Sequence, residues 1–146
     1  MQNTSSEDFK KSYIDCNNSH ISSINKIKNE LSITSKLLNN NKNIDKIKNK
    51  IDNLLDVFNY TNAAFNITKM QYLVLYIISY MKENNMLKTS KIPVKTSLKL
   101  LLKQDWITQD TKKFLSKFYE RSLKGENFSL YVLNLDTYLQ YIDILK

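Results

Sequence analysis

Cys16 and His20 are the one cysteine and the one histidine of the chain, and they lie four residues apart. On a continuous helix this spacing would place both on one face, where a histidine can activate a thiol as a nucleophile. A catalytic pair also needs a third group that orients the base, and none is evident. Asn17, Asn18 and Ser19 further predict a helix break between the two. We therefore expect a buried or tolerated free thiol and a cap-region histidine.

Metal ligands and phosphate-binding loops are equally sparse. One histidine and one cysteine cannot supply the usual zinc or di-iron ligand sets. Asp52 and Asp56 lie four apart and could form half of a hard-cation site, but no second acidic pair accompanies them, so two solvated acids beside lysines are the ordinary interpretation. The single glycine, Gly125, leaves no glycine-rich loop for a nucleotide phosphate. The sequence predicts no catalytic residue, no metal and no cofactor, and thus a protein that is not an enzyme.

Basic side chains form the first candidate binding surface. The formal net charge is +8, and on two neighbouring helices the basic residues would make one positive patch that neutralises phosphates. The opposing interpretation is a solvated lysine face, which any amphipathic helix shows opposite its apolar stripe. Lysine also lacks the bidentate geometry of arginine. The candidate patch for a nucleic acid or an acidic partner comprises Lys88, Lys91, Lys95, Lys99, Lys103, Lys112, Lys113, Lys117, Arg121 and Lys124.

Aromatic residues form the second candidate surface. The chain carries one Trp, nine Tyr and six Phe. Trp106 and Tyr119 lie beside the candidate basic patch in the sequence, where they could stack on bases or contact a protein partner, since Trp and Tyr are favoured in binding hot spots. Trp106 stands at a predicted helix junction. It is either exposed for a partner or plugs the core between helices, and the sequence leaves both open.

The whole chain of 146 residues has the size of one domain, and we expect residues 1–146 to form a single unit with residues 1–5 frayed. One glycine and one proline predict long helices joined by polar loops, because tight turns between strands need more of both. Residues 1–15 are polar and contain no secretory signal. No apolar run reaches the ~20 residues of a membrane span. The sequence predicts an intracellular protein of open oligomeric state.

Residues 68–84 are the stretch that the fold should surround. Between residues 70 and 81 the sequence is apolar or aromatic at nearly every position, which indicates a helix buried on all sides. A buried strand is the alternative, because Tyr, Val and Ile favour strands, but the signals at the start of the segment favour a helix. Thr68 and Gln71 fit a capping box at its start, and Asn84 and Asn85 mark its end, since Asn tolerates the left-handed conformation. The sequence therefore predicts a central core helix.

Two amphipathic helices precede it, over residues 19–38 and 43–58. Apolar residues recur three and four apart in both, which predicts an antiparallel hairpin, and a connector over residues 59–67 follows. An intermolecular coiled coil is the alternative, but each helix offers only about two heptads and a sustained coiled coil needs three to four. The proposed seam comprises Ile24, Ile27, Leu31, Leu38, Ile44, Ile47, Ile51, Leu54 and Phe58.

The remaining helices are predicted from caps and stripes. The stretch Ser5-Ser6-Glu7-Asp8 can cap a short first helix, and Pro93 fits the first turn of a later one. Thr108 caps the next helix, and Gly125 sits where a residue after a helix end would sit. Residues 127–145 predict a closing helix, with a strand over 128–133 as the alternative. The expected fold is all-α, a bundle of six or seven helices around residues 68–84.

In layout, several amphipathic helices around one apolar helix are similar to Bcl-2-like bundles, although the Asn-Trp-Gly-Arg-type signature of that family is absent. Residues 61–103 resemble the helical N-terminal domain of transcription elongation factor TFIIS. Neither resemblance assigns a role to a residue. The sequence predicts a non-enzymatic helical module that binds a partner protein through a groove or helical face. A basic nucleic-acid-associated protein, using a lysine patch over residues 88–124, is the alternative.

Overall fold

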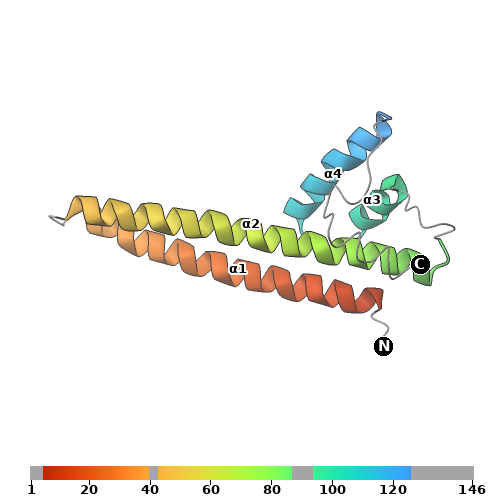
Figure 1. The fold of residues 1–146 in the computed structure, drawn as a ribbon, viewed down its shortest axis with the longest axis horizontal. Helices are drawn as coiled ribbons and strands as arrows, with labels where there is room; N and C mark the ends of the chain where they lie inside the picture. The colour runs from red at the N-terminus through yellow and green to blue at the C-terminus, as the bar shows by residue number, and fades with distance from the viewer. Residues whose placement is uncertain (1–4, 40–42, 87–93, 126–146) are drawn as a thin grey trace. The chain divides into compact units, whose positions relative to one another are not determined.

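The computed structural model describes residues 5–39, 43–86 and 94–125, and the regular structure in these ranges is entirely helical (Figure 1). Helix α1 spans Ser6–Lys36 and continues into a short 3-10 turn, η1, at Leu37–Asn39. Helix α2 spans Ile44–Glu83, α3 spans Val94–Leu102 and α4 spans Gln109–Leu123. None of these helices is long and apolar enough to cross a bilayer. The predicted all-helical class is confirmed for the described residues.

The predicted count of six or seven helices is wrong, because the described residues form four α-helices. Two expected breaks, residues 17–19 and 59–67, are helical, so predicted neighbours merge into helices of 31 and 40 residues. Each Asn or Ser destabilises a helix by less than about 1 kcal/mol. Packing of the side chains on the inner face of each continuous helix outweighs that cost. Pro93 and the predicted closing helix over 127–145 lie outside the described residues.

The chain divides into two compact units. Unit 1 comprises Met1–Ile14 and Lys69–Lys146, and unit 2 is Asp15–Thr68. Each long helix therefore contributes one segment to each unit.

The core of unit 1 surrounds the apolar part of α2, as the sequence predicts. This segment is buried on nearly every side, and α3 and α4, which pack against each other, contribute further apolar residues. Complete burial of one such side chain stabilises the fold by roughly 1.5–3 kcal/mol. The fully buried members of this core are Tyr13, Leu73, Val74, Ile77, Ile78, Met81, Leu98, Leu101 and Leu115.

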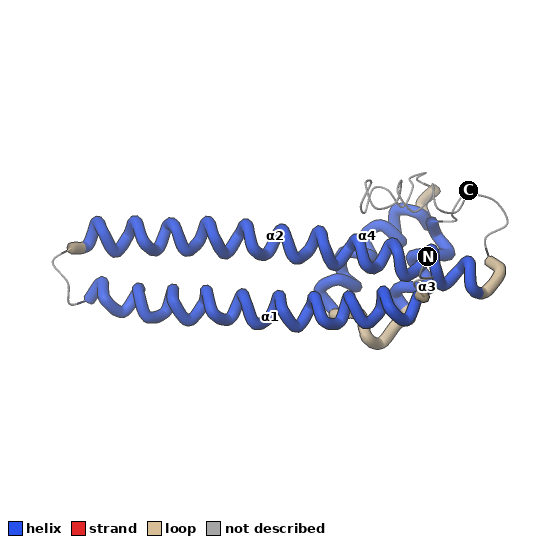
Figure 2. Tube along the Cα trace, turned by 60° about the horizontal axis from the view of Figure 1, so that its bottom comes forward, coloured by secondary structure: helices blue, strands red, loops and turns tan. Residues whose placement is uncertain are grey.

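Unit 2 is an antiparallel hairpin of the later part of α1 and the earlier part of α2 (Figure 2). Two helices alone cover only one side of each other, so few seam residues are fully enclosed. Ile47, Thr34 and His20 are the buried ones, and two of these are polar. The hydroxyl of Thr34 is buried without a hydrogen-bond partner among the described residues. The seam is thus thin, and much apolar surface of the hairpin stays in solvent.

Several helix ends follow the predicted signals. Ser5 Oγ accepts the Asp8 amide at 3.3 Å, and the Asp8 carboxylate accepts the Ser5 amide at 3.1 Å, which closes a capping box at the start of α1. Asn85, just beyond α2, has φ 55°, and Gly125, beyond α4, has φ 88°. These left-handed conformations end helices without strain at Asn or Gly.

Two predicted caps turn out differently. Thr68 lies inside α2, where its hydroxyl donates to the Ala64 carbonyl at 3.1 Å. The predicted capping box there is wrong, because the helix is already continuous. Thr108 does occupy the N-cap position of α4 with an extended backbone, but its hydroxyl donates to Thr111 Oγ1 at 3.0 Å and makes no side-chain cap bond.

Candidate functional site

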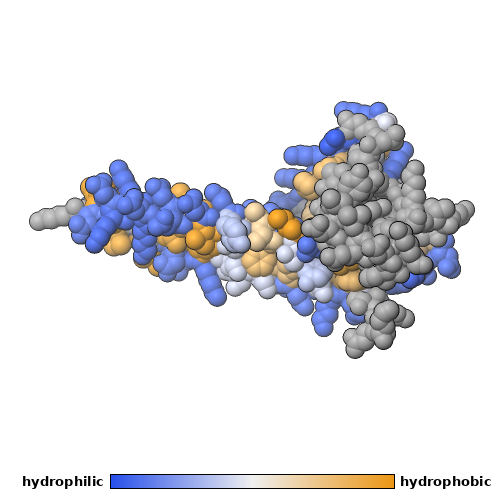
Figure 3. Space-filling model, in the orientation of Figure 1, coloured by the Kyte–Doolittle hydropathy of each residue, from blue (hydrophilic) through white to orange (hydrophobic). Residues whose placement is uncertain are grey.

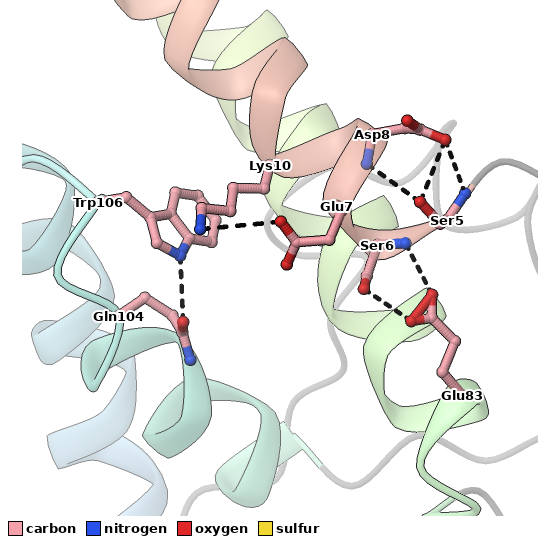
Figure 4. A network of polar contacts seen from close by, with 8 residues as sticks. All are labelled: Ser5, Ser6, Glu7, Asp8, Lys10, Glu83, Gln104 and Trp106. Carbon is pink, nitrogen blue, oxygen red and sulfur yellow. Dashed lines mark hydrogen bonds and ion pairs between the residues drawn. The ribbon is translucent and has the colours of Figure 1, made fainter.

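Trp106 packs against the core of unit 1. Its ring meets Tyr13 edge-on at a centroid distance of 5.4 Å and Tyr76 at 4.8 Å. Its indole Nε1 donates to Gln104 Oε1 at 3.1 Å (Figure 4). The polar edge of the ring is therefore satisfied within the fold. This arrangement favours the interpretation that Trp106 fills the core between helices over the interpretation that it is exposed for a partner.

Lys10 lies over the Trp106 ring as well. Lys10 Nζ lies 5.8 Å from the centroid of the Trp106 ring, a cation–π geometry, and 3.9 Å from the Glu7 carboxylate (Figure 4). Tyr119 is half-buried and packs against the same core. A base or a partner side chain stacking on either aromatic would thus compete with contacts that unit 1 already makes.

Polar contacts tie the start of α1 to other parts of unit 1. The Ser6 amide and hydroxyl each donate to the Glu83 carboxylate at 2.7 Å, near the end of α2 (Figure 4). The Tyr13 hydroxyl donates to Thr111 Oγ1 at 3.1 Å and accepts the Thr108 amide at 3.3 Å, at the start of α4. These bonds position helices, and they explain why polar residues are tolerated beside the core.

The pKa of Tyr76 departs clearly from its ordinary value. Burial, followed by the nearby Tyr80, Glu7 and Glu83, raises its pKa above 10.0. Both causes disfavour the phenolate. Its ring stacks against Tyr80 at 5.9 Å and meets Trp106 edge-on. A phenol that holds its proton more firmly is not an activated acid or base at neutral pH.

The candidate basic patch is exposed but mixed in sign. Lys88 and Lys91 lie outside the described residues. On α4, the acids Asp110 and Glu120 are exposed among the basic residues, and the Arg121 guanidinium lies 5.6 Å from the Phe118 ring centroid. Lys112 is half-buried. The exposed basic members in or directly after α3 and α4 are Lys95, Lys99, Lys103, Lys113, Lys117, Arg121 and Lys124.

The chain is helical through Cys16 and His20, so the expected break between them is wrong. His20 is buried in the hairpin seam, where its ring stacks on Phe65 at 4.9 Å and its Nε2 lies 2.7 Å from Asn62 Oδ1. This environment supports a structural histidine.

Asp52 and Asp56 are both exposed on α2. Across the described ranges, no three His, Cys, Asp or Glu side chains gather in an arrangement that would hold a metal ion. The two acids keep the ordinary interpretation of solvated charges.

Helix α2 carries a second apolar stripe, which the sequence interpretation does not identify. Val57, Tyr60, Ala64 and Ile67 follow one another by three, four and three residues, which places them on one face of the helix. Tyr60 is 78% exposed, Ile67 56% and Val57 49%. At about 100° per residue this face points away from the seam residue Phe58. We name these four residues the outer stripe.

The sequence interpretation does not identify the outer stripe, because it treats residues 59–67 as a connector. The signal was present in the spacing of its four residues, which is that of the a and d positions of a heptad. Only the continuity of α2 turns that spacing into one surface.

The segment around the outer stripe is free of charge. Residues 57–68 of α2 contain no Lys, Arg, Asp or Glu, and neither do residues 16–25 of α1, although a quarter of the whole chain is charged. Figure 3 shows hydrophilic side chains gathered toward the end of the hairpin where α1 connects to α2, and paler and apolar surface farther along the helix pair. Interface cores in proteins show this composition, depleted in charge and enriched in Tyr.

No protein-family model matches the chain, and neither a curated protein nor a solved structure matches it. The layout resemblances to Bcl-2-like bundles and to the TFIIS domain thus gain no support. The outer stripe is defined by the geometry of α2 alone.

Proposed function

We propose that the chain is a non-enzymatic protein-interaction module and that the outer stripe of α2 is the surface that binds its partner. One observation carries the proposal. Four apolar residues at helical spacing, led by the 78%-exposed Tyr60, lie in a segment without charge on a continuous helix. A solvated helix face is normally polar, so an apolar face on the outside of a hairpin needs an explanation.

The energetics favour binding through this face. Complete burial of an aliphatic side chain such as Val57 or Ile67 in an interface contributes roughly 1.5–3 kcal/mol to the free energy of binding. Tyr60 can bury its apolar ring in the same interface while its hydroxyl reaches the polar rim. The helix exists before binding, so little backbone entropy is lost on association. Anchors at i, i+3, i+7 and i+10 are the pattern by which a helix occupies a groove or packs on another helix.

A photo-cross-linker in place of Tyr60 tests this proposal in cells that naturally contain the protein. We expect protein adducts from position 60 and none from the same group in place of Lys48, an exposed residue on another side of α2. Equal yields from both positions, or none from either, would refute the outer stripe as a binding surface.

A nucleic-acid-associated function is the second candidate, and the exposed lysines of α3 and α4 favour it. If it is right, fluorescence anisotropy with labelled DNA and RNA will show binding that weakens steeply with salt, with a slope that counts the neutralised phosphates. Replacing Lys95, Lys99 and Lys103 with Gln should flatten that slope. No binding at low salt would remove this candidate and leave the protein-binding proposal untouched.

A further inference from the structure

We propose that the partner of the outer stripe is an amphipathic helix that lies along α2; this inference rests on the proposed function of the stripe. The inward side of the partner helix is apolar opposite the stripe and acidic opposite two lysines that extend the same face of α2. These two residues are Lys46 and Lys50, and we name them the stripe lysines. The chemistry of the partner thus follows from what one face of α2 presents along its length.

Helical spacing places the stripe lysines and the outer stripe on one face of α2. From Lys46 the chain reaches Lys50, Asn53 and Val57 in steps of four, three and four residues, and the outer stripe continues the same alternation to Ile67. Steps of three and four keep side chains on one side of a helix. The acidic residues of α2 fall outside this series, so the charges within it are positive.

The same face is covered beyond Ile67, and an amphipathic helix covers it there. Val74 and Ile78 are fully buried in the core of unit 1. Ser97 Oγ of α3 donates to Met81 Sδ of α2 at 3.3 Å, so α3 packs against this part of the helix. Over the outer stripe the face is exposed. A partner helix that ends level with Ile67 continues the packing toward the hairpin end and leaves the buried part undisturbed.

The stripe lysines give the partner its second property. Lys46 and Lys50 are exposed, and neither forms an ion pair with a residue that the structure describes. Two positive charges at one end of an apolar stripe favour acidic side chains at the matching end of the partner and exclude basic ones, because charge complementarity sets orientation and selects partners. An exposed ion pair adds little affinity. The stripe therefore supplies most of the binding, and the lysines supply selectivity.

The length of the face sets the length of the partner. From Lys46 to Ile67 the face extends about 32 Å, at about 1.5 Å per residue. A helix of about 22 residues covers that distance, with apolar side chains over about three turns and Asp or Glu over about two more. Such a contact lies at the small end of specific interfaces. We expect a dissociation constant on the order of micromolar.

Photo-cross-linking from two positions on this face, in cells that naturally contain the protein, is the first arm of the test. A photoreactive group replaces Tyr60 in one variant and Lys50 in another, and the control replaces Lys48, on another side of α2. We expect positions 60 and 50 to link to one segment of the same partner. The two link sites should lie about ten residues apart, since the two positions are about 15 Å apart along α2. Asp or Glu should flank the site linked from position 50.

Several results would overturn the helical partner and leave the proposed function standing. These are adducts from position 60 without adducts from position 50, link sites in two different proteins, a linked segment with Lys or Arg opposite the stripe lysines, and a linked segment that belongs to a second copy of the chain. Background yields from both positions would refute the proposed function as well.

Two synthetic helical peptides supply the second arm, with binding to the full chain measured by fluorescence anisotropy. Each peptide carries Leu at a and d spacing over three turns. Over the next two turns one peptide has Glu on the same side and the other has Lys. We expect the Glu peptide to bind about tenfold more tightly than the Lys peptide at low salt. The preference should shrink at high salt, because the charges are then screened.

Charge reversal identifies the residues that set this preference. Lys46→Glu/Lys50→Glu should reverse it, whereas Lys48→Glu, the matched change on another side of α2, should leave it unchanged. Tyr60→Asp should weaken both peptides about tenfold or more. All four positions are exposed, so the helical circular dichroism should stay unchanged. Equal binding of the two peptides, no binding of either, or an effect of Lys48→Glu as large as that of the double reversal would overturn the proposal.

Discussion

Tyr13→Phe is the substitution that best isolates a polar contribution to unit 1. The Tyr13 ring is fully buried beside Trp106, and its hydroxyl bonds Thr108 and Thr111 nearly a hundred residues away in the chain. Removing one oxygen leaves the ring contacts in place. The change therefore measures what the hydroxyl contributes to holding the start of α4 on the first turns of α1.

The hydrogen-bond geometry sets the expected magnitude. A net hydrogen bond contributes about 0.5–1.5 kcal/mol, and a buried group left without a partner costs about 1–3 kcal/mol. Thr108 is half-buried, so water can reach its amide, whereas Thr111 is buried. We expect Tyr13→Phe to lower the free energy of unfolding by about 1–2 kcal/mol, a large share of the ~5–15 kcal/mol typical of a domain.

Urea unfolding followed by Trp106 fluorescence and by helical circular dichroism is the assay, because Trp106 is the single Trp and contacts Tyr13. Tyr60→Phe is the matched control: its hydroxyl is exposed, and the change should stay within about 0.5 kcal/mol. The double variant Tyr13→Phe/Thr111→Val should show a coupling energy of about 0.5–1.5 kcal/mol. A Tyr13→Phe effect as small as that of Tyr60→Phe, with no coupling, would refute the assigned role.

Three further changes are expected to behave as follows. Ile77→Ala, at a fully buried position, should cost about 2–5 kcal/mol in urea unfolding. Glu83→Gln weakens the two bonds from Ser6 and should speed hydrogen exchange in the first turn of α1, with exchange in α4 unchanged. Burial raises the pKa of Tyr76 above 10.0, so its contribution to stability is intact below pH 10 and is lost as the pH rises through the folded-state pKa. Urea midpoints should therefore fall more in the native chain than in Tyr76→Phe as the pH is raised above 10.

The centre of the fold was predictable because one segment is apolar on all sides. Leu73, Ile77 and Ile78 are buried as the run over residues 70–81 predicts. The left-handed Asn85 and Gly125 were predictable for a related reason, since few residues adopt that conformation without strain. Strong local signals of this kind need no tertiary context.

Weak local signals misled the prediction. Asn17, Asn18 and the Asn-rich residues 59–67 disfavour a helix only slightly, and packing along the hairpin seam overrides them. His20, Asn62 and Phe65 meet there and carry the helices through the expected breaks. A connector over residues 59–67 would contain no outer stripe, because its face exists only on a continuous α2.

A cross-linking scan along residues 57–68, one photoreactive group at a time in cells that naturally contain the protein, tests most directly whether the outer stripe binds a protein. The stripe predicts adducts that peak in place of Val57, Tyr60, Ala64 and Ile67 and fall to background between them. Yields without this helical period, or at background throughout, would contradict the assignment of this face as the binding surface.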